Sequence, residues 1–365
     1  MQHVIDQFAT IIRTAAARKA PLCLRGGGSK DFYGNRIAGQ SGDMLDTAAY
    51  AGIVDYEPTE LVVTARAGTR LADLEAELRK QGQMLAFEPP HFNAAATLGG
   101  CVASGLSGPR RPSAGAVRDF VLGVRMLDGR GDDLRFGGQV MKNVAGYDVS
   151  RLLTGSMGTL GLLLEVSLKV LPLPPLELTL RMPMNEAEAI TKMNSWAGKP
   201  LPVSATCFCD GALWLRFSGA EPAVRAAHAK LGGEKLTEDE GVAFWESVRE
   251  QRHAFFQSGK PLWRLSIKSS TPPLSLPGPQ LIEWGGALRW LAADVNTEAD
   301  AERVRVAAKA AGGHATLFRS GGGGGELPAG VFHPLAPEMM LIHRRLKEKF
   351  DPMGIFNPGR MYREL

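Results

Sequence analysis

One run of small residues constrains this chain more than any other stretch of its sequence. Between Ala94 and Gly108 the chain reads A-A-A-T-L-G-G-C-V-A-S-G-L-S-G, with almost no side chain large enough to fill a core. Glycine costs backbone entropy and short side chains bury little area, so such a run can neither form a stable helix alone nor stabilise a core. It predicts a segment whose backbone NH groups lie against something large, and a flexible surface loop is the alternative.

Two other glycine-rich stretches lie on either side of this run. Leu24-Arg-Gly-Gly-Gly-Ser-Lys30 follows a short apolar strand, and Gly155-Ser-Met-Gly-Thr-Leu-Gly161 leads into a long apolar strand. Backbone NH groups that converge in a glycine-rich turn, beside the cations Arg25 and Lys30, suit a phosphate group. Neither the G-x-G-x-x-G dinucleotide fingerprint nor a Walker A loop is present. Together the three stretches predict one long ligand that is contacted three times.

Composition argues against several classes of protein. The chain has 365 residues, of which 44% are hydrophobic and 22% charged, as expected for a globular protein of roughly two domains. A net charge of +4, without a long basic run, does not indicate nucleic-acid binding. The first residues lack the pattern of a signal peptide and no segment has membrane-spanning length. We therefore expect a cytoplasmic protein whose membrane contact, if it has one, comes through a partner.

The cysteines and histidines give no metal-binding pattern. Four cysteines and seven histidines are scattered along the chain, and no two histidines have ligand spacing. Cys207 and Cys209 could form a metal or redox pair, but we expect all four cysteines to be buried structural thiols. The sequence therefore predicts no metal site.

The order of strands and helices divides the chain into three parts. Pro172, Pro174 and Pro175 end the long apolar strand and mark a boundary. After it, strands alternate with helices and glycines are few, which predicts an α+β domain with an antiparallel sheet. A helix over 337–350 and a turn-rich tail predict a last segment that docks back on the first domain. The expected domains are residues 1–174, 175–335 and 336–365.

Three local patterns in the chain make further predictions. Thr69 is expected to cap a helix over 71–78. Arg110 and Arg111 are expected in a solvated turn, with phosphates or a partner's carboxylates as alternatives. Residues 320–325 read S-G-G-G-G-G and predict a linker, with a further phosphate loop or a partner surface as alternatives.

Four motifs, taken in order, resemble a known family. They are Arg25-Gly-Gly-Gly-Ser29, the run from Thr97 to Gly108, Lys142-Asn-Val-Ala-Gly-Tyr-Asp148 and the stretch 155–161. Their order is similar to that of the vanillyl-alcohol-oxidase-type FAD flavoproteins, also called PCMH-type, and the ending F-D-P-M-G-I-F-N-P-G resembles that family's C-terminus. The resemblance covers essentially the whole chain. It implies an FAD-binding domain of two α/β subdomains followed by an α+β cap domain.

Three further stretches favour one branch of that family. Glu88-Pro-Pro-His-Phe92, Leu262-Trp-Arg-Leu-Ser266 and Trp284-Gly-Gly-Ala-Leu-Arg-Trp290 resemble the FAD-binding subunits of glycolate oxidase. This resemblance implies glycolate as the substrate, glyoxylate as the product and an electron acceptor other than NAD.

The resemblance also implies which residues bind FAD. The first loop would wrap the pyrophosphate, the second would line the flavin and ribityl chain, and the third would run along the adenine and the dimethylbenzene ring. The residues expected to bind the cofactor are Leu24, Arg25, Gly26, Gly27, Gly28, Ser29, Lys30, Glu88, Pro89, Pro90, His91, Thr97, Leu98, Gly99, Gly100, Ser104, Gly105, Leu106, Ser107, Met157, Gly158, Thr159, Leu160, Gly161, Leu162 and Leu163.

Many members of that family attach FAD covalently, through a histidine in the first loop or a cysteine in the second. The first loop here has no histidine, and Cys101 does not lie where the attachment cysteine is expected. We therefore expect FAD to be bound noncovalently.

Catalytic residues are harder to assign. Relatives that oxidise 2-hydroxy acids resemble one another in a metal-binding segment with His-x-His and Gly-Asp-Gly-Asn, which this sequence lacks. His91, Lys142, Asn143, Tyr147 and Arg264 are weak candidates for residues near the isoalloxazine ring. Each has a structural alternative: His91 could hold a loop backbone, and Arg264 could belong to an internal ion pair.

Three functions remain open at this point. The first is the FAD-binding subunit of a multi-subunit 2-hydroxyacid oxidase, in which a second FAD-containing subunit holds the metal-bearing site. An iron–sulfur subunit would then carry electrons towards the inner membrane. The second is a self-sufficient FAD-dependent oxidase or dehydrogenase, and the third is a non-redox assembly subunit.

Overall fold

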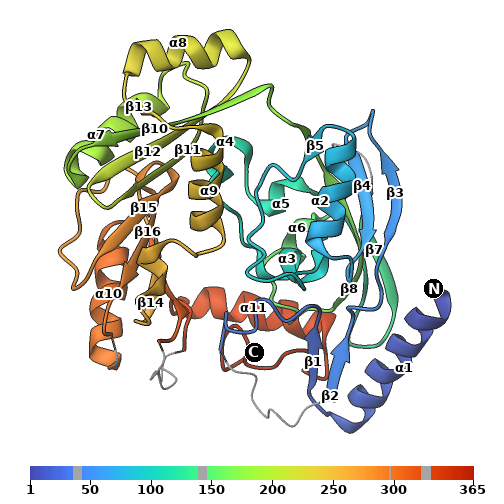
Figure 1. Ribbon diagram of the computed structural model, residues 1–365. Helices are drawn as coiled ribbons and strands as arrows, with labels where there is room; N and C mark the ends of the chain where they lie inside the picture. The colour runs from blue at the N-terminus through green and yellow to red at the C-terminus, as the bar shows by residue number, and fades with distance from the viewer. Residues whose placement is uncertain (36–42, 139–145, 296, 322–329) are drawn as a thin grey trace.

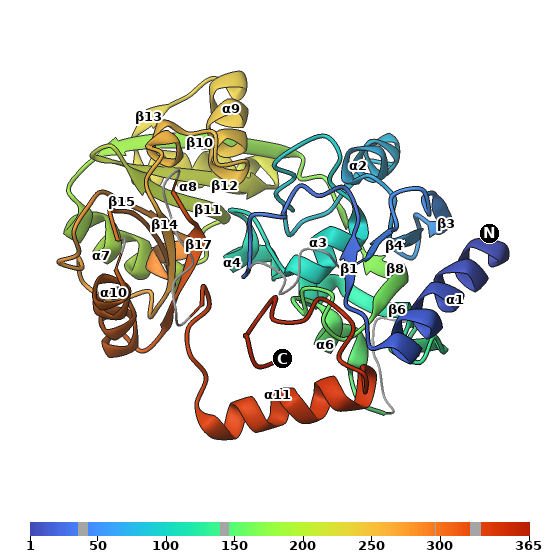
Figure 2. The ribbon, with the colours of Figure 1, turned by 90° about the horizontal axis from the view of Figure 1, so that it is seen from below.

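The computed structural model describes residues 1–35, 43–138, 146–295, 297–321 and 330–365. In it, two large antiparallel sheets lie in the two halves of the molecule, and the C-terminal helix crosses beneath them (Figures 1 and 2). Lys142, Asn143 and residues 322–325, which the sequence singled out, lie outside the described residues. None of the helices in the described part of the chain combines the length and the hydropathy needed to cross a bilayer.

The first half is built on a five-stranded antiparallel sheet. Its order is β3-β4-β8-β6-β7, and β8 at its centre reads LLLEVSLK with most positions buried. Side chains alternate along β8 with a bulge at Leu164, so the strand contributes to two apolar clusters, one on each face of the sheet. The strands are β3 (Ile53–Glu57), β4 (Val62–Arg66), β6 (Val121–Leu127), β7 (Asp133–Gly137) and β8 (Leu162–Lys169).

Short helices and a two-stranded ladder cover this sheet. The helices are α2 (Leu71–Lys80), α3 (Leu98–Ser104), α5 (Val117–Phe120) and α6 (Val149–Leu153), and the ladder joins β5 (Gln83–Met84) to β9 (Leu171–Pro172). Helix α4 (Arg111–Ala114) instead contacts the sheet of the second half. The predicted helix after Thr69 is present, but the predicted cap is wrong. Its N-cap is Arg70 without a side-chain cap bond, and the Thr69 hydroxyl instead accepts from the Gly52 NH, 2.9 Å away.

A small parallel unit lies on the other face of the five-stranded sheet. Helix α1 (Gln2–Arg18) packs with β1 (Leu22–Arg25) and β2 (Asp43–Asp46), which pair in parallel. Leu22 of β1 also forms a parallel bridge to Phe356, so the end of the chain extends this unit. Both side chains are fully buried.

The second half is an eight-stranded antiparallel sheet with helices packed on it. The strand order is β13-β10-β12-β11-β15-β16-β14-β17. The elements are β10 (Leu176–Pro183), α7 (Glu186–Ala197), β11 (Val203–Cys209), β12 (Ala212–Gly219), α8 (Glu221–Leu231), β13 (Glu234–Lys235), α9 (Glu238–Arg249), η1 (Ala254–Gln257), β14 (Leu262–Ser266), β15 (Gln280–Glu283), η2 (Trp284–Gly286), β16 (Leu288–Ala292), α10 (Glu298–Ala310) and β17 (His314–Arg319). The predicted α+β class, with an antiparallel sheet after residue 175, is confirmed.

The last segment returns to the first half. Helix α11 (Pro337–Phe350) runs under the molecule, and its end packs on the core of the five-stranded sheet through Leu346 and Phe350 (Figure 2). Its buried Lys347 ammonium donates to the Thr159 carbonyl at 2.8 Å and pairs with Asp351 at 2.8 Å. The tail after α11 is thereby held against the third glycine-rich loop.

Candidate cofactor-binding site

The three glycine-rich loops meet at two adjoining cavities of about 420 and 80 Å³. The larger volume lies within the range of roughly 300–1,000 Å³ that small-molecule and cofactor sites occupy. Sixteen of the residues expected to bind the cofactor line one cavity or both: Leu24, Arg25, Gly26, Gly27, Gly28, Ser29, Lys30, Thr97, Gly99, Gly100, Ser104, Met157, Gly158, Gly161, Leu162 and Leu163. The fold therefore brings together segments that are more than a hundred residues apart in sequence.

The first loop leaves β1 and packs tightly under the second. A Cβ atom on Gly27 would lie 1.4 Å from the Ala95 carbonyl oxygen, so no side chain fits there. Gly28 has φ +67°, in the left-handed region that favours glycine. The small side chains of this loop are thus required partly by contact with another protein segment, and not only by a ligand.

The second loop begins helix α3. The Thr97 hydroxyl caps it by accepting from the Gly100 NH at 3.3 Å. Gly99 packs on Ala67, and a Cβ atom added to Gly99 would lie 2.7 Å from the Cβ atom of Ala67. Gly100 differs, because an added Cβ would meet only the Thr97 hydroxyl oxygen, at 3.2 Å, and this residue lines both cavities. Gly100 is therefore the position of this loop that most directly keeps space open.

The third loop is joined to the second by backbone contacts. The Met157 NH donates to the Ala103 carbonyl at 2.8 Å, and the Gly155 NH donates to the Val102 carbonyl at 2.9 Å. An added Cβ on Gly105 would lie 2.9 Å from the Gly155 Cα. This close approach explains the small residues where the two loops cross.

The tail supplies a residue that sequence reasoning missed. Asn357 is buried and lines both cavities. Its side-chain oxygen accepts from the Leu24 NH at 2.8 Å, and its amide nitrogen donates to the Met157 carbonyl at 2.7 Å. One side chain thus fastens the first loop to the third. The turn residues F-N-P-G at 356–359 are visible in the sequence, but the sequence alone does not show which residues Asn357 contacts.

Of the three cations that line the larger cavity, Arg25, Lys30 and Arg360, only Arg25 forms an ion pair with a carboxylate of the described residues. Arg25 pairs with Asp31 at 2.7 Å, and the Arg360 guanidinium donates to the carbonyls of Asp31 and Tyr33 at 2.8 and 2.6 Å. Lys30 is buried, and its ammonium donates to the Ser29 hydroxyl at 3.2 Å, with no carboxylate in ion-pair contact among the described residues. Burial lowers the pKa of Lys30. An anion in the cavity would supply the missing charge.

The thiols of the site are poor nucleophiles. Cys101 does not line either cavity, and burial raises its pKa to about 12. Cys23 is half-buried and does line the larger cavity, which the sequence did not indicate, and burial raises its pKa as well. No histidine lines either cavity in the described part of the chain. These facts favour noncovalent binding.

The remaining residues of the expected set lie away from these cavities. Leu98 and Leu106 are buried in apolar clusters, and Thr159 and Leu160 line a separate cavity beside α11. Gly105 and Ser107 lie at packing contacts of the second loop, where the Ser107 hydroxyl accepts from the Val117 NH. Pro89 and Pro90 are buried in the segment 88–91, away from both cavities.

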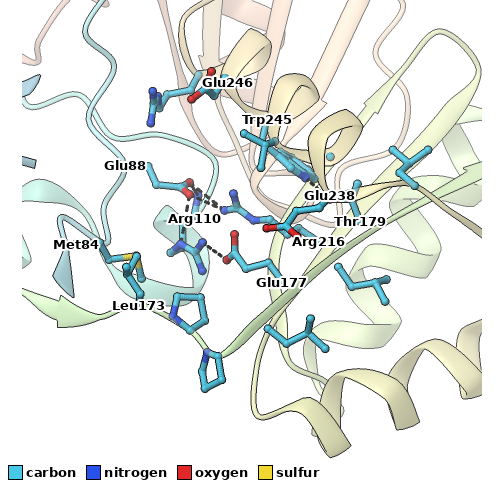
Figure 3. A pocket seen from close by; sticks show the side chains of 18 of the residues that line it. Met84, Glu88, Arg110, Leu173, Glu177, Thr179, Arg216, Glu238, Trp245 and Glu246 are labelled. Atoms are coloured by element: carbon cyan, nitrogen blue, oxygen red, sulfur yellow. Dashed lines mark hydrogen bonds and ion pairs between the residues drawn. The ribbon is translucent and has the colours of Figure 1, made fainter. Parts of the chain in front are cut away.

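Glu88 lies at the centre of an ion-pair cluster between the two halves of the molecule. Its carboxylate accepts from the Arg110 NH at 2.8 Å and lies 2.8 Å from the Arg216 guanidinium, while Arg110 also pairs with Glu177 (Figure 3). The cluster borders a cavity of about 560 Å³, lined from both halves. The expectation that Arg110 lies in a solvated turn is wrong: its side chain is 8% exposed, because β10 and β12 supply its partners.

The described catalytic candidates are not gathered at the loops. The His91 ring lies 3.2 Å from Glu75, and its backbone NH donates to Glu250 at 3.1 Å. Tyr147 is 94% exposed. Arg264 lies over the Trp284 ring, 5.2 Å from its centroid. It forms no ion pair with another described residue, so the internal ion pair considered for it is not present among the described residues. Burial lowers the pKa of Arg264.

The arrangement fits a long, phosphate-bearing cofactor. Two adjoining cavities follow three loops, the open position at Gly100 leaves room for a flat group, and the uncompensated Lys30 matches an anionic one. FAD has these features, with a flat ring system at one end and a pyrophosphate in its middle.

Comparison with known proteins agrees with this fit. A family model described as an FAD binding domain matches residues 3–137. Glycolate oxidase subunit GlcE of Escherichia coli K12 is 49% identical over 97% of this chain and 96% of its own length. A D-lactate dehydrogenase of Anaerostipes hadrus is 30% identical, over 50% of this chain and 38% of its own length.

Solved structures agree at the level of the fold. A crystal structure of p-cresol methylhydroxylase with substrate bound superposes with a TM-score of 0.67 at 13% identity, covering 98% of this chain and 87% of that chain. An alkyldihydroxyacetonephosphate synthase gives a TM-score of 0.64 at 15% identity, covering 96% of this chain and 74% of that chain. With FAD as its cofactor, this chain belongs to the GlcE family of FAD-dependent oxidoreductases.

Proposed function

We propose that this chain is the FAD-binding subunit of a multi-subunit oxidase of small 2-hydroxy acids, with glycolate as its substrate. The observation that carries the proposal is the 49% identity, along nearly the whole of both chains, to a protein named as a subunit of glycolate oxidase. A glycolate oxidase subunit GlcD of Bacillus subtilis and several D-lactate dehydrogenases match a shorter part of the chain. Their substrates belong to the same chemical class.

The residues that line the two adjoining cavities, called the cofactor cradle below, would hold the cofactor and balance its charge. FAD, when bound, would supply this subunit with a redox centre that can accept and release electrons. Lys30 would balance a negative charge on the cofactor, and backbone NH groups of the first loop would donate to phosphate oxygens. Asn357 would keep the first and third loops in register and so keep the cavities in shape.

We assign oxidation of the substrate to a second flavin subunit that holds a metal site, with electrons then passing to an iron–sulfur subunit. Abstraction of a proton from a 2-hydroxy acid needs a base beside the flavin. The described lining of the two cavities contains no histidine, and its one carboxylate, Asp31, is engaged by Arg25 at 2.7 Å. Beyond the first loop, Tyr33 packs in an aromatic cluster with Phe318 and Phe332 rather than around an open polar site.

One observation favours the second candidate, a chain that oxidises substrate by itself. Arg111 and Arg264 lie over the same Trp284 ring, 4.5 and 5.2 Å from its centroid, and neither forms an ion pair with another described residue. Burial lowers the pKa of both guanidinium groups, and the charge of Arg264 lowers the pKa of Arg111 further. Such a pair could hold the carboxylate of a 2-hydroxy acid.

Anaerobic titration with glycolate separates the two candidates. Under our proposal the purified chain, loaded with FAD, keeps its oxidised flavin spectrum, and glycolate bleaches the flavin only after the other subunits are co-expressed and co-purified. Bleaching of the lone chain at a catalytically useful rate, lost in an Arg264→Gln variant, would establish the self-sufficient enzyme instead.

A further inference from the structure

Three potential metal ligands, Cys209, Asp210 and His253, meet at one end of strand β11 in the second half of the molecule, and a fourth, Cys207, lies next to them on the strand. Cys207 and Cys209 are two residues apart on this strand, so their side chains point to the same face. Asp210 follows in the turn to β12, and His253 comes from the segment between α9 and η1, more than forty residues away. Both cysteines are buried, His253 is half-buried and Asp210 is exposed.

Their ligand atoms are already at the separations that a small cation requires. The Cys209 sulfur lies 3.9 Å from His253 Nε2, and His253 Nε2 lies 3.6 Å from an Asp210 carboxylate oxygen. These three atoms are all within 4.8 Å of one another, and Cys207 lies on the same face of β11 as Cys209. Tetrahedral Zn²⁺ binds sulfur at about 2.3 Å and imidazole nitrogen at about 2.0–2.1 Å, which sets ligand atoms somewhat under 4 Å apart.

We propose that Cys207, Cys209, Asp210 and His253 form a binding site for one Zn²⁺ ion. Two thiolates with an imidazole select a thiophilic cation of tetrahedral preference over Mg²⁺ or Ca²⁺, which take oxygen ligands. The site departs from the expectation of no metal, because the sequence separates His253 from the cysteines and only the fold joins them. It is independent of the cofactor cradle, whose cavities none of the four residues lines.

Binding requires one local rearrangement, at His253. Its Nδ1 accepts from the Phe255 NH at 3.3 Å, which places the ring proton on Nε2. A metal at Nε2 needs the proton on Nδ1, so this long hydrogen bond opens when the ion binds. The Asp210 side chain is 77% exposed and can adjust to complete the coordination. The ring itself is held by edge contact with Phe244, 5.9 Å between centroids.

The test is metal titration of the full-length, FAD-loaded chain after removal of metals with a chelator. Co²⁺ serves as the optical probe, because tetrahedral thiolate-bound Co²⁺ absorbs at longer wavelength than flavin, and Zn²⁺ then displaces it. We expect one Co²⁺ per chain, displaced by one Zn²⁺, with thermal stability rising on addition of Zn²⁺. A spectrum without these bands, or no Zn²⁺ retained after gel filtration, would overturn the proposal.

Variants decide whether the ion is held by these residues. Cys209→Ser is expected to abolish the Co²⁺ bands, and Asp210→Asn, at an exposed position that leaves folding intact, should weaken Zn²⁺ binding at least tenfold. Cys101→Ala removes a buried thiol elsewhere and should leave metal binding unchanged. Unaltered bands in both Cys209→Ser and Asp210→Asn would place the ion at another site and contradict the proposal, whatever the outcome for glycolate oxidation.

Discussion

At the scale of single residues, Lys30 and Gly100 determine what the cradle can hold. Lys30 is a buried cation without an ion-pair partner among the described residues, so the protein without its ligand bears an uncompensated charge. A buried charge that lacks a partner is costly, and a bound anion removes that cost. Gly100 determines space rather than charge, because a side chain there would project into the cavities.

Replacing Lys30 should weaken FAD binding and change its pH dependence. Charge-assisted hydrogen bonds contribute about 1.5–3 kcal/mol, so Lys30→Met is expected to raise the Kd for FAD about tenfold to a hundredfold. The control Lys80→Met, at a side chain that is 66% exposed, should leave the Kd unchanged. Flavin fluorescence titration measures both. An unchanged Kd in Lys30→Met would remove Lys30 from the site.

The pH dependence of FAD binding follows from the direction in which the pKa of Lys30 is shifted. Burial lowers its pKa, so on raising the pH this ammonium loses its proton before an exposed lysine does. FAD affinity should therefore be level near neutral pH and fall as the pH rises through the lowered pKa, still below the ordinary value for lysine. Titrations at several pH values should show this fall in the native chain and not in Lys30→Met. The same fall in both proteins would assign it to another group.

Filling the space at Gly100 should abolish FAD binding without unfolding the chain. The residue lies in a helix and an added Cβ meets only one hydroxyl oxygen, so Gly100→Leu is tolerated by the backbone. Its side chain would occupy the cavities. Gly198→Leu, at a surface position where nothing lies within 4 Å of an added Cβ, is the matched control. Absorbance of the purified proteins reports bound flavin, and full flavin content in Gly100→Leu would refute the assignment.

At the scale of elements, the C-terminal tail is part of the first half of the molecule. Phe356 bridges to β1, Asn357 joins two glycine-rich loops, and Lys347 donates to the Thr159 and Phe356 carbonyls. Buried polar groups without partners are costly, so these bonds fix the tail in one position. We propose that the segment 336–365 is a structural component of the cradle, consistent with the expected division of the chain.

Removing the Asn357 amide should loosen both loops. Asn357→Ala leaves the Leu24 NH and the Met157 carbonyl without partners, which is expected to lower the free energy of unfolding by about 1–3 kcal/mol and to weaken FAD binding. Asn357→Asp keeps the acceptor but loses the donor, so its loss should be smaller. Chemical denaturation with and without FAD measures the effect. Equal stability of all three proteins would show that the tail does not hold the loops.

The sequence predicted features that depend on neighbouring residues better than contacts between residues far apart in the chain. The α+β class, with an antiparallel sheet after residue 175, follows from neighbouring residues and was confirmed, whereas the boundary near Pro172 stays a prediction. Asn357 and the Cys209–His253 pair escaped because each acts across a large separation in sequence. Arg110 was misjudged for the same reason, since Arg-Arg-Pro resembles a surface turn until β10 and β12 cover it.

At the scale of the whole molecule, an ion-pair cluster joins the two halves. Glu88, from the first half, contacts Arg216 from β12, and Arg110 contacts Glu177 from β10. Glu88 has φ +49°, an uncommon conformation for a residue other than glycine. The cluster therefore holds the second sheet in a fixed position relative to the segment 88–92.

Breaking this cluster should destabilise the molecule more than a surface change does. Glu88→Gln removes the carboxylate that pairs with Arg216 and leaves Arg110 with Glu177 as its remaining ion-pair partner, and breaking a buried ion pair costs about 3–5 kcal/mol. Glu246→Gln, at a side chain that is 49% exposed and whose nearest cation is 3.7 Å away, should cost less than about 1 kcal/mol. Thermal unfolding compares them. A Glu88→Gln protein as stable as Glu246→Gln would mean that the two halves are held together by other contacts.

The measurement that tests the account most directly is the flavin content of the purified chain, read before and after acid precipitation. We predict one FAD per chain in the native protein, none in Gly100→Leu, and all of the flavin in the supernatant after precipitation. A native chain that purifies without flavin and does not bind added FAD, or a denatured pellet that remains yellow, would contradict a noncovalent FAD site formed by the three loops and the tail.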